Sequence, residues 1–270
     1  MHYVVAGVGE TVLMLHGFPE SWYSWRHQIA ALASYYRVIA PDLRGYNETE
    51  SQGPYDTDTI QADVLSLLDH AGVERAHVVA HDWGGAIAWL LAIGHPERVQ
   101  SLTVCNIPHP ALFQRGLRRN PRQMLRSWYI AFFQIPWLPE RVLAAHRYHT
   151  LARMLINDCR PGTFTREDLG HMLASWRRSG LGGGIGWYRA LLRHPRRLPR
   201  PVPTVTAPTL MIWGEDDSAL GRDLTDGTEQ YVEKFELKLL PNTSHWVQQE
   251  EPRAVSEMIL EHIRKAPLHA

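Results

Sequence analysis

The segment AHVVAHDWGGAIAWLL constrains the fold of this 270-residue chain more than any other part of the sequence. Its valine-containing first half predicts a strand up to His81, and its apolar second half predicts a helix that begins at Gly84-Gly85. Glycines suit this helix start because a side chain there would block the close approach of helix to strand. The tight turn between strand and helix would present the side chain of Asp82 above the end of a sheet.

Short β-branched runs alternate with helical stretches on both sides of this segment. The spacing of apolar residues predicts helices over 58–71 and 252–263, and Gly72 is placed to end the first of them. Alternating strands and helices are typical of a mostly parallel sheet flanked by helices. The predicted strands are 2–5, 11–15, 37–40, 76–80, 100–105, 209–213 and 235–240.

The stretch 108–207 differs from the rest of the chain in both pattern and charge. It holds 17 Arg, no Lys and four acids, whereas the whole chain has 28 basic and 28 acidic residues. We interpret it as a basic, all-helical lid on an acidic core, inserted before the last two strands. The chain then divides into core 1–107, lid and proline-rich return connection 108–207, and core 208–270. The predicted lid helices are 123–133, 141–155, 165–178 and 185–192.

The composition excludes several classes of protein. An apolar fraction of 44% and a charged fraction of 21% exclude a disordered or fibrous chain. Two cysteines, Cys105 and Cys159, exclude a disulfide scaffold and fit a reducing compartment. The start has no signal-peptide pattern, and no window approaches the roughly 18 apolar residues of a membrane helix. We therefore expect a cytoplasmic protein with no membrane or nucleic-acid partner, and the sequence leaves the oligomeric state open.

Sequence motifs for metals and cofactors are missing. There is no HExxH, no paired Cys/His zinc spacing, no GxxxxGK and no GxGxxG between a strand and a helix. His77 and His81 fall on one face of a predicted strand, but no third ligand accompanies them. The sequence therefore predicts neither a metal nor a cofactor.

Asp82 is the candidate nucleophile. A carboxylate has a reference pKa of about 3.9 and attacks at neutral pH without first losing a proton. Attack at a saturated carbon would give an alkyl-type ester, which must later be hydrolysed. The alternative interpretation is an Asp that caps the following helix.

Hydrolysis of such an ester needs a base and a group that orients it. His245 follows the last predicted strand and precedes the final helix, so a loop would bring it over the sheet. Asp216 and Asp217 directly follow another predicted strand, and either could accept the Nδ1 proton of His245. The order nucleophile, acid, histidine is one of the three known orders for such a triad.

The segment HGFP, after the strand 11–15, offers a site for a developing negative charge. The backbone N–H groups of Phe18 and of Trp83 would together form an oxyanion hole. By itself, HGFP could equally be a tight turn. It indicates an oxyanion hole only in combination with the turn at Asp82.

At these residues the chain resembles the α/β-hydrolase superfamily and, within it, the epoxide hydrolase family, over essentially its whole length. The matching segments are HGFPESW, PDLRGY, HDWGG, PERV with NIPHP, RSWYIAFFQIPWLPE, SGLGGGIGWYRALL, WGEDD and SHWVQQEEP. The resemblance implies an α/β-hydrolase fold with Asp217 as the acid. Two departures stand out: Asn47 replaces a common Gly, and Gly186 replaces a common Asn.

The lid motifs of the family place two tyrosines opposite the nucleophile, and they fall here on Tyr129 and Tyr188. A phenol has a reference pKa of about 10 and stays protonated at neutral pH. It could donate a hydrogen bond to the oxygen of a strained ring. The unspecific alternative for each tyrosine is a core aromatic on a helix.

The resemblance implies an epoxide hydrolase that opens a small apolar epoxide to a vicinal diol with water. Asp82 would form the ester, Tyr129 and Tyr188 would bind the epoxide oxygen, and His245 with Asp217 would activate water. A haloalkane or haloacid dehalogenase with the same triad is the first alternative, because Trp83 would permit halide binding. A non-catalytic ligand-binding protein on the same fold is the second.

Overall fold

A seven-stranded sheet forms the centre of the computed structural model, which describes residues 1–195 and 198–266. The strand order is β1-β3-β2-β4-β5-β6-β7, with β1 antiparallel to β3 and every other neighbouring pair parallel. All seven predicted strands are confirmed within one residue at each end. They are β1 Tyr3–Ala6, β2 Thr11–Leu15, β3 Arg37–Pro41, β4 Ala76–His81, β5 Val99–Cys105, β6 Thr209–Gly214 and β7 Phe235–Leu240.

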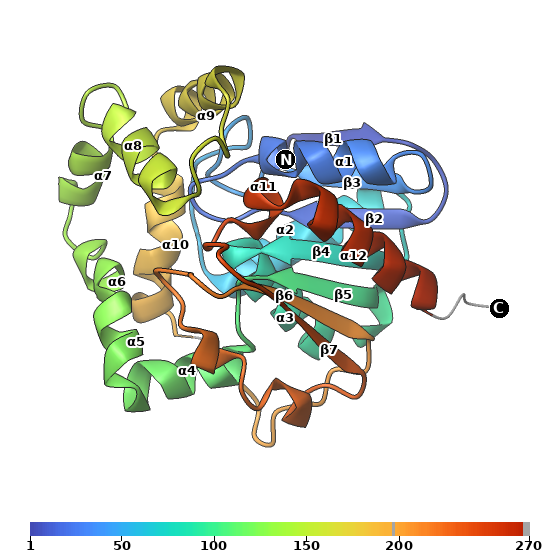
Figure 1. The fold of residues 1–270 in the computed structure, drawn as a ribbon. Coiled ribbons are helices and arrows are strands. Elements are labelled where there is room, and N and C mark those ends of the chain that lie inside the picture. The colour runs from blue at the N-terminus through green and yellow to red at the C-terminus, as the bar shows by residue number, and fades with distance from the viewer. Residues whose placement is uncertain (196–197, 267–270) are drawn as a thin grey trace.

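Helices cover both faces of the sheet (Figure 1). On one face α1 (Arg26–Leu32) packs on α12 (Pro252–Lys265), with the short α11 (Val247–Glu250) beside them. On the other face α2 (Thr57–His70) packs on α3 (Asp82–Gly94). Side chains of β2 alternate between the two apolar clusters, as a strand buried on both faces requires.

The predicted helices of the core begin and end for local reasons. The carboxylate of Asp56 accepts a hydrogen bond from the backbone N–H of Thr59 and so caps α2. After its last residue, Gly72 has a φ of +68°, which is the left-handed conformation typical of a helix end. Helix α1, which the sequence analysis did not predict, is seven residues long, has no side-chain cap at its N-terminus and packs against α12.

The lid lies between β5 and β6 and contributes no strand to the sheet among the described residues. Residues 196–197 of the return connection, and 267–270 at the C-terminus, lie outside those described. Figure 1 shows α10 between the sheet and the other lid helices. The lid helices are α4 Pro110–Arg119, α5 Pro121–Arg126, α6 Trp128–Phe132, α7 Leu138–Leu143, α8 His149–Asp158, α9 Arg166–Ser179 and α10 Gly182–Arg193.

Two of the predicted lid helices are each divided into two. The predicted helix 123–133 is interrupted at Ser127, between α5 and α6. The predicted helix 141–155 is interrupted because His146, Arg147 and Tyr148 all have positive φ values, which no right-handed helix accommodates. The lid is therefore made of short helices joined at sharp corners. Helix α4 was not predicted.

Candidate active site

The end of β4 presents Asp82 in a tight turn, as the sequence predicts, but α3 already begins at Asp82 and not at Gly84-Gly85. Asp82 has a φ of +48°, a strained value for a residue with a side chain. A Cβ at Gly84 would clash with the carbonyl oxygens of Leu15 and His16, and a Cβ at Gly17 would clash with Asp82 itself. The glycines therefore allow the turn and the end of β2 to lie in direct contact.

The Asp82 carboxylate is partly exposed, with 13% of its side-chain surface accessible, and lies between β2 and the loop after β7. Its Oδ1 accepts a hydrogen bond of 2.8 Å from the backbone N–H of Phe18, and its Oδ2 lies 3.6 Å from Nε2 of His245. Burial acts to raise the pKa of Asp82, but the hydrogen bond and positive charge of His245 outweigh burial and the net pKa is lowered. Asp82 is therefore an anion at neutral pH.

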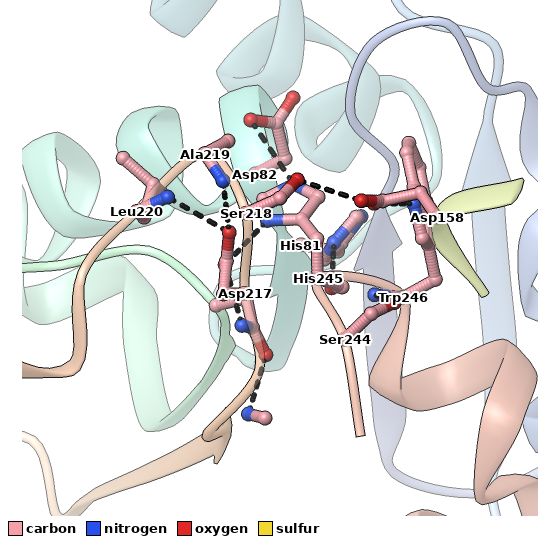
Figure 2. Close-up of polar contacts among 12 residues, drawn as sticks. His81, Asp82, Asp158, Asp217, Ser218, Ala219, Leu220, Ser244, His245 and Trp246 are labelled. Carbon is pink, nitrogen blue, oxygen red and sulfur yellow. Dashed lines mark hydrogen bonds and ion pairs between the residues drawn. The ribbon is translucent and has the colours of Figure 1, made fainter. Parts of the chain in front are cut away.

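His245 lies between Asp82 and Asp217, with its Nδ1 at 2.7 Å from Oδ2 of Asp217 (Figure 2). Burial acts to lower the pKa of His245, and the two carboxylates reverse that effect and raise it well above its usual range. The imidazole is thus held in its charged form while both neighbours are ionised. The structure brings together the three residues that the sequence predicts as a triad.

Three further hydrogen bonds orient Asp217. Its Oδ1 accepts from the backbone N–H groups of Ala219 and Leu220, each at 2.8 Å, and its Oδ2 also accepts from the side-chain amide of Asn106 at 2.7 Å. Asp216, the other candidate, is exposed, and within residues 1–195 and 198–266 its side chain makes no hydrogen bond to His245. The resemblance to the family implied Asp217, and not Asp216, as the acid, and this geometry agrees.

The two lid tyrosines lie close to each other and to the turn at Asp82. The ring centroids of Tyr129, on α6, and Tyr188, on α10, are 5.8 Å apart. Tyr188 also packs edge-on against Phe18 at 5.5 Å and Trp83 at 5.1 Å. Burial, followed by the negative charge of Asp82, raises the pKa of both phenols above their usual range, so both remain protonated donors.

Of the two predicted oxyanion-hole donors, Phe18 already binds Asp82 through its N–H. Trp83 is the second residue of α3, so its N–H belongs to the first turn, where amides have no partner within the helix. Both donors thus come from backbone next to Asp82. The peptide bond between Phe18 and Pro19 is cis.

A second histidine–carboxylate pair, which the sequence analysis did not identify, lies directly beneath the first. Nδ1 of His81 is 2.8 Å from Oε2 of Glu20, and Nε2 of His81 is 3.0 Å from the backbone carbonyl oxygen of His245. Glu20 also accepts from the N–H of Gly17 and the side chain of Gln248. The signal was present in the sequence, because Glu20 and His81 fall within HGFPE and HDW.

Polar contacts connect the lid to the loops that carry the triad. The carboxylate of Asp158, at the end of α8, accepts from Ser218 Oγ at 2.6 Å and from Trp246 Nε1 at 2.9 Å (Figure 2). Ser218 and Trp246 are the direct sequence neighbours of Asp217 and His245. Asp158 therefore joins the lid to both loops at once.

The two departures from the family pattern have local explanations. Asn47 has a φ of +44°, so it adopts the left-handed conformation expected of it. A Cβ at Gly186 would clash with the ring of Tyr55, so that tyrosine occupies the space beside α10. No group of three or more His, Cys, Asp or Glu side chains among the described residues could hold a metal ion.

Comparison with known proteins gives concordant matches. Residues 10–252 match the model of the alpha/beta hydrolase fold family. Epoxide hydrolase 4 of Homo sapiens is 40% identical over 270 residues, which cover 96% of this chain and 74% of that protein. The AB hydrolase superfamily protein YfhM of Bacillus subtilis (strain 168) is also 40% identical, over 98% of this chain and 94% of that protein.

A solved structure is similar over nearly the whole chain. The crystal structure of an epoxide hydrolase from Bacillus megaterium, in complex with an inhibitor, superimposes with a TM-score of 0.90 at 30% identity. The match covers 98% of this chain and 96% of that one. The likeness therefore includes the lid as well as the sheet.

Proposed function

This chain belongs to the alpha/beta hydrolase fold family and, within it, to the epoxide hydrolases, and on that premise we propose that it hydrolyses a small apolar epoxide to a vicinal diol through an ester on Asp82. The observation that carries the mechanism is the alignment of Asp82, His245 and Asp217 beneath two protonated tyrosines. The reaction needs only water and the side chains and backbone amides of this chain.

In the first step Oδ2 of Asp82 attacks a ring carbon of the epoxide. The new bond joins that oxygen to carbon, the ring C–O bond breaks, and its electron pair stays on the ring oxygen. Tyr129 and Tyr188 donate hydrogen bonds to that oxygen, and one of them supplies the proton that completes the hydroxyl group. The negative charge of Asp82 favours this arrangement, because it keeps both phenols protonated.

In the second step water attacks the carbonyl carbon of the ester, and Nε2 of His245 takes the proton. The N–H groups of Phe18 and Trp83 stabilise the oxyanion that develops on Oδ1. The tetrahedral intermediate then collapses, the C–O bond between the Asp82 carboxyl carbon and the diol oxygen breaks, and that oxygen takes the proton held on Nε2 of His245 and leaves as the diol. The second proton of the attacking water passes from the Asp82 carboxyl group to His245, which restores the carboxylate and the charged imidazole. Asp82 keeps one oxygen atom from water.

The charges around His245 explain how this one histidine is protonated in the free enzyme and acts as a base once the ester has formed. In the free enzyme the carboxylate of Asp82 is one of the two groups that raise the pKa of His245. Ester formation removes the charge of Asp82 while that of Asp217 remains, so the pKa of His245 falls, and the proton of His245 passes to the tyrosine that protonated the ring oxygen. The imidazole thus becomes a competent base only after the ester has formed.

The substitution His245→Gln tests the covalent step. Attack by a carboxylate needs no base, whereas loss of base assistance should slow ester hydrolysis by about 100- to 10,000-fold. Intact-protein mass spectrometry of His245→Gln with styrene oxide should show the added mass of one epoxide, which peptide mapping places on Asp82. The matched variant Asp82→Asn should show no early adduct.

Two outcomes would contradict the proposal. An adduct on Asp216, Asp217 or a lid residue would place the chemistry elsewhere. Release of halide from a haloalkane by the unmodified enzyme, without diol formation from any epoxide, would favour the dehalogenase alternative.

We also propose that the protein is cytoplasmic. Cys105 and Cys159 are both buried and free, and burial raises the pKa of both thiols, which keeps them in the unreactive form. Two unpaired thiols support a reducing compartment.

A further inference from the structure

The helices α5 to α8 carry most of the large apolar side chains that this structure exposes. Leu125 is 75% exposed, Trp137 is 62% exposed and Trp128 is 61% exposed, which is unusual for such side chains. We call the surface formed by these side chains and by the arginines described below the outer lid face. Its apolar residues are Met124, Leu125, Trp128, Ile135, Trp137, Val142, Met154 and Ile156.

The outer lid face is turned away from the sheet and from the candidate active site. Figure 1 shows α6, α7 and α8 on the side of α10 that is turned away from the sheet, with α5 at the lower end of the lid. The neighbouring residues Trp128 and Tyr129 illustrate the two sides of α6. Trp128 is exposed, whereas Tyr129 packs against Phe133 and Tyr188 on the inside.

The charged groups of this surface are almost exclusively positive. All eight arginines of the segment 110–158 are exposed, and none forms an ion pair with a carboxylate among residues 1–195 and 198–266. The two acids of the segment are already engaged: Glu140 pairs with Arg189, and Asp158 binds Ser218 and Trp246. Arg115 and Arg126 reach back to the core, where they donate to the backbone carbonyl oxygens of Asp226 and Asp217, so they are not counted in the outer lid face. Its arginines are Arg118, Arg119, Arg122, Arg141, Arg147 and Arg153.

We infer that the outer lid face binds the surface of a lipid bilayer that contains anionic phospholipids. Exposed tryptophans occupy the boundary between headgroups and acyl chains, and leucine, isoleucine, valine and methionine side chains insert beside them. Arginines bind the phosphate groups of anionic lipids. Arg141 lies over the ring of Trp137, with its guanidinium carbon 5.0 Å from the ring centroid. A phosphate-binding group and an apolar ring are therefore in direct contact on this surface.

The same charges argue against a second copy of this chain as the occupant. In a two-fold symmetric dimer each outer lid face would meet an identical one, so its six arginines would oppose six others. A nucleic acid would neutralise the arginines but would leave the aliphatic side chains without an apolar partner. An anionic bilayer satisfies both the charge and the apolar surface.

The binding is peripheral, since no helix of the described residues is long and apolar enough to cross a membrane. It departs from the expectation drawn from the sequence, which was no membrane partner, because the exposure of these side chains is visible only in the structure. The inference is independent of the proposed reaction, since its test measures binding and not turnover.

The full-length protein is mixed with phosphatidylcholine vesicles that contain or lack phosphatidylglycerol, and binding is measured by flotation. We expect binding only when phosphatidylglycerol is present, with a shift of tryptophan emission to shorter wavelength. Raising the salt concentration to about 1 M, where the screening length falls to roughly 3 Å, should release the arginine-dependent part.

Two sets of substitutions separate the apolar and the charged contributions. The triple variant Leu125→Ser, Trp128→Ser, Trp137→Ser should bind at least about tenfold more weakly and lose the emission shift. The triple variant Arg118→Gln, Arg119→Gln, Arg122→Gln should weaken binding about tenfold or more at low salt. Thermal melting followed by circular dichroism checks that each variant is folded.

The matched control changes three exposed apolar residues of the core. Val5, Val8 and Tyr35 are 47%, 82% and 59% exposed, so Val5→Ser, Val8→Ser, Tyr35→Ser removes a similar amount of exposed apolar surface. This variant should bind vesicles like the unmodified protein. Equal losses in core and lid variants would overturn the inference, as would failure of the unmodified protein to bind anionic vesicles at low salt. Self-association that the lid variants abolish, without vesicle binding, would instead assign the face to a second copy.

Discussion

The core and the lid contribute to the same site, but they hold their residues in different ways. Asp82, His245 and Asp217 are fixed by hydrogen bonds to neighbouring backbone and side chains. Tyr129 and Tyr188 contact their neighbours chiefly through aromatic rings. Hydrogen bonds are directional and set both position and charge, whereas ring packing tolerates small rotations. In the proposed reaction the core therefore supplies the nucleophile and the base, and the lid supplies the hydrogen-bond donors for the epoxide oxygen.

The boundary between the two regions is itself tightly constrained. Gly183, in the first turn of α10, packs against the backbone of Gly45 in the core, and a Cβ at either glycine would clash with the other residue. Gly184 similarly faces the ring of Phe18, whose amide binds Asp82. The lid is therefore positioned over the core by close backbone contact, and the polar bridge at Asp158 lies at another point of the same boundary.

Removing the charge of the core acid should have the largest effect. Asp217→Asn keeps the size of the side chain but cannot stabilise the imidazolium form of His245, so kcat should fall by about 1,000- to 10,000-fold. Because ester formation precedes the need for the base, the ester should accumulate in rapid-quench mass spectrometry. The matched control Asp216→Asn alters an exposed carboxylate and should keep kcat within about twofold. Equal losses in both variants would contradict the assignment of Asp217.

Removing the hydroxyl group of Tyr129 or Tyr188 should have a smaller effect, and the effect should fall on ester formation and not on ester hydrolysis. Tyr129→Phe or Tyr188→Phe should slow ester formation by about 10- to 1,000-fold, and the double variant should be nearly inactive. Hydrolysis of an ester already formed should change little, because the tyrosines do not touch the water-activating pair in the proposed mechanism. Pre-steady-state kinetics separate the two steps. Full activity in the double variant would restrict the proposal to a generic Asp-dependent hydrolase.

The smallest effect is expected from a substitution at the boundary between the lid and the core. Gly183→Ala should force α10 away from Gly45 and lower the free energy of unfolding by about 1–3 kcal/mol, with a several-fold loss of kcat/KM. Gly182→Ala is the matched control, since a Cβ there meets nothing within 4 Å. Thermal melting and steady-state kinetics measure both effects. If the two variants behave alike, close contact at this boundary does not position the lid.

Much of the core could be predicted from short sequence segments. Each strand is a local run of apolar and β-branched residues, and the turn at Asp82 depends on glycines one to three residues away. Parallel strands also bring their carboxyl ends to one edge, so Asp82, Asp217 and His245 could be expected to meet there. For these features the local sequence pattern agrees with the fold, so the pattern alone was enough to predict them.

The lid was less predictable because its helices end where tertiary packing requires a corner. Arg147 and Tyr148 are not residue types that favour positive φ, yet both adopt it, together with His146, between α7 and α8. Their conformation depends on neighbours that the lid acquires only after it has folded onto the core.

The sequence by itself determined the sheet, the position of the strained turn and, through its resemblance to a family, the residues that meet there. Only the tertiary structure decided that Glu20 and His81 support His245, that Asp158 joins α8 to two core loops, and that tryptophans and arginines share one outer face. The physical reason is sequence separation. Strands and tight turns are specified by interactions within a few residues, whereas these contacts join residues that are tens to more than a hundred positions apart and exist only once the chain is packed.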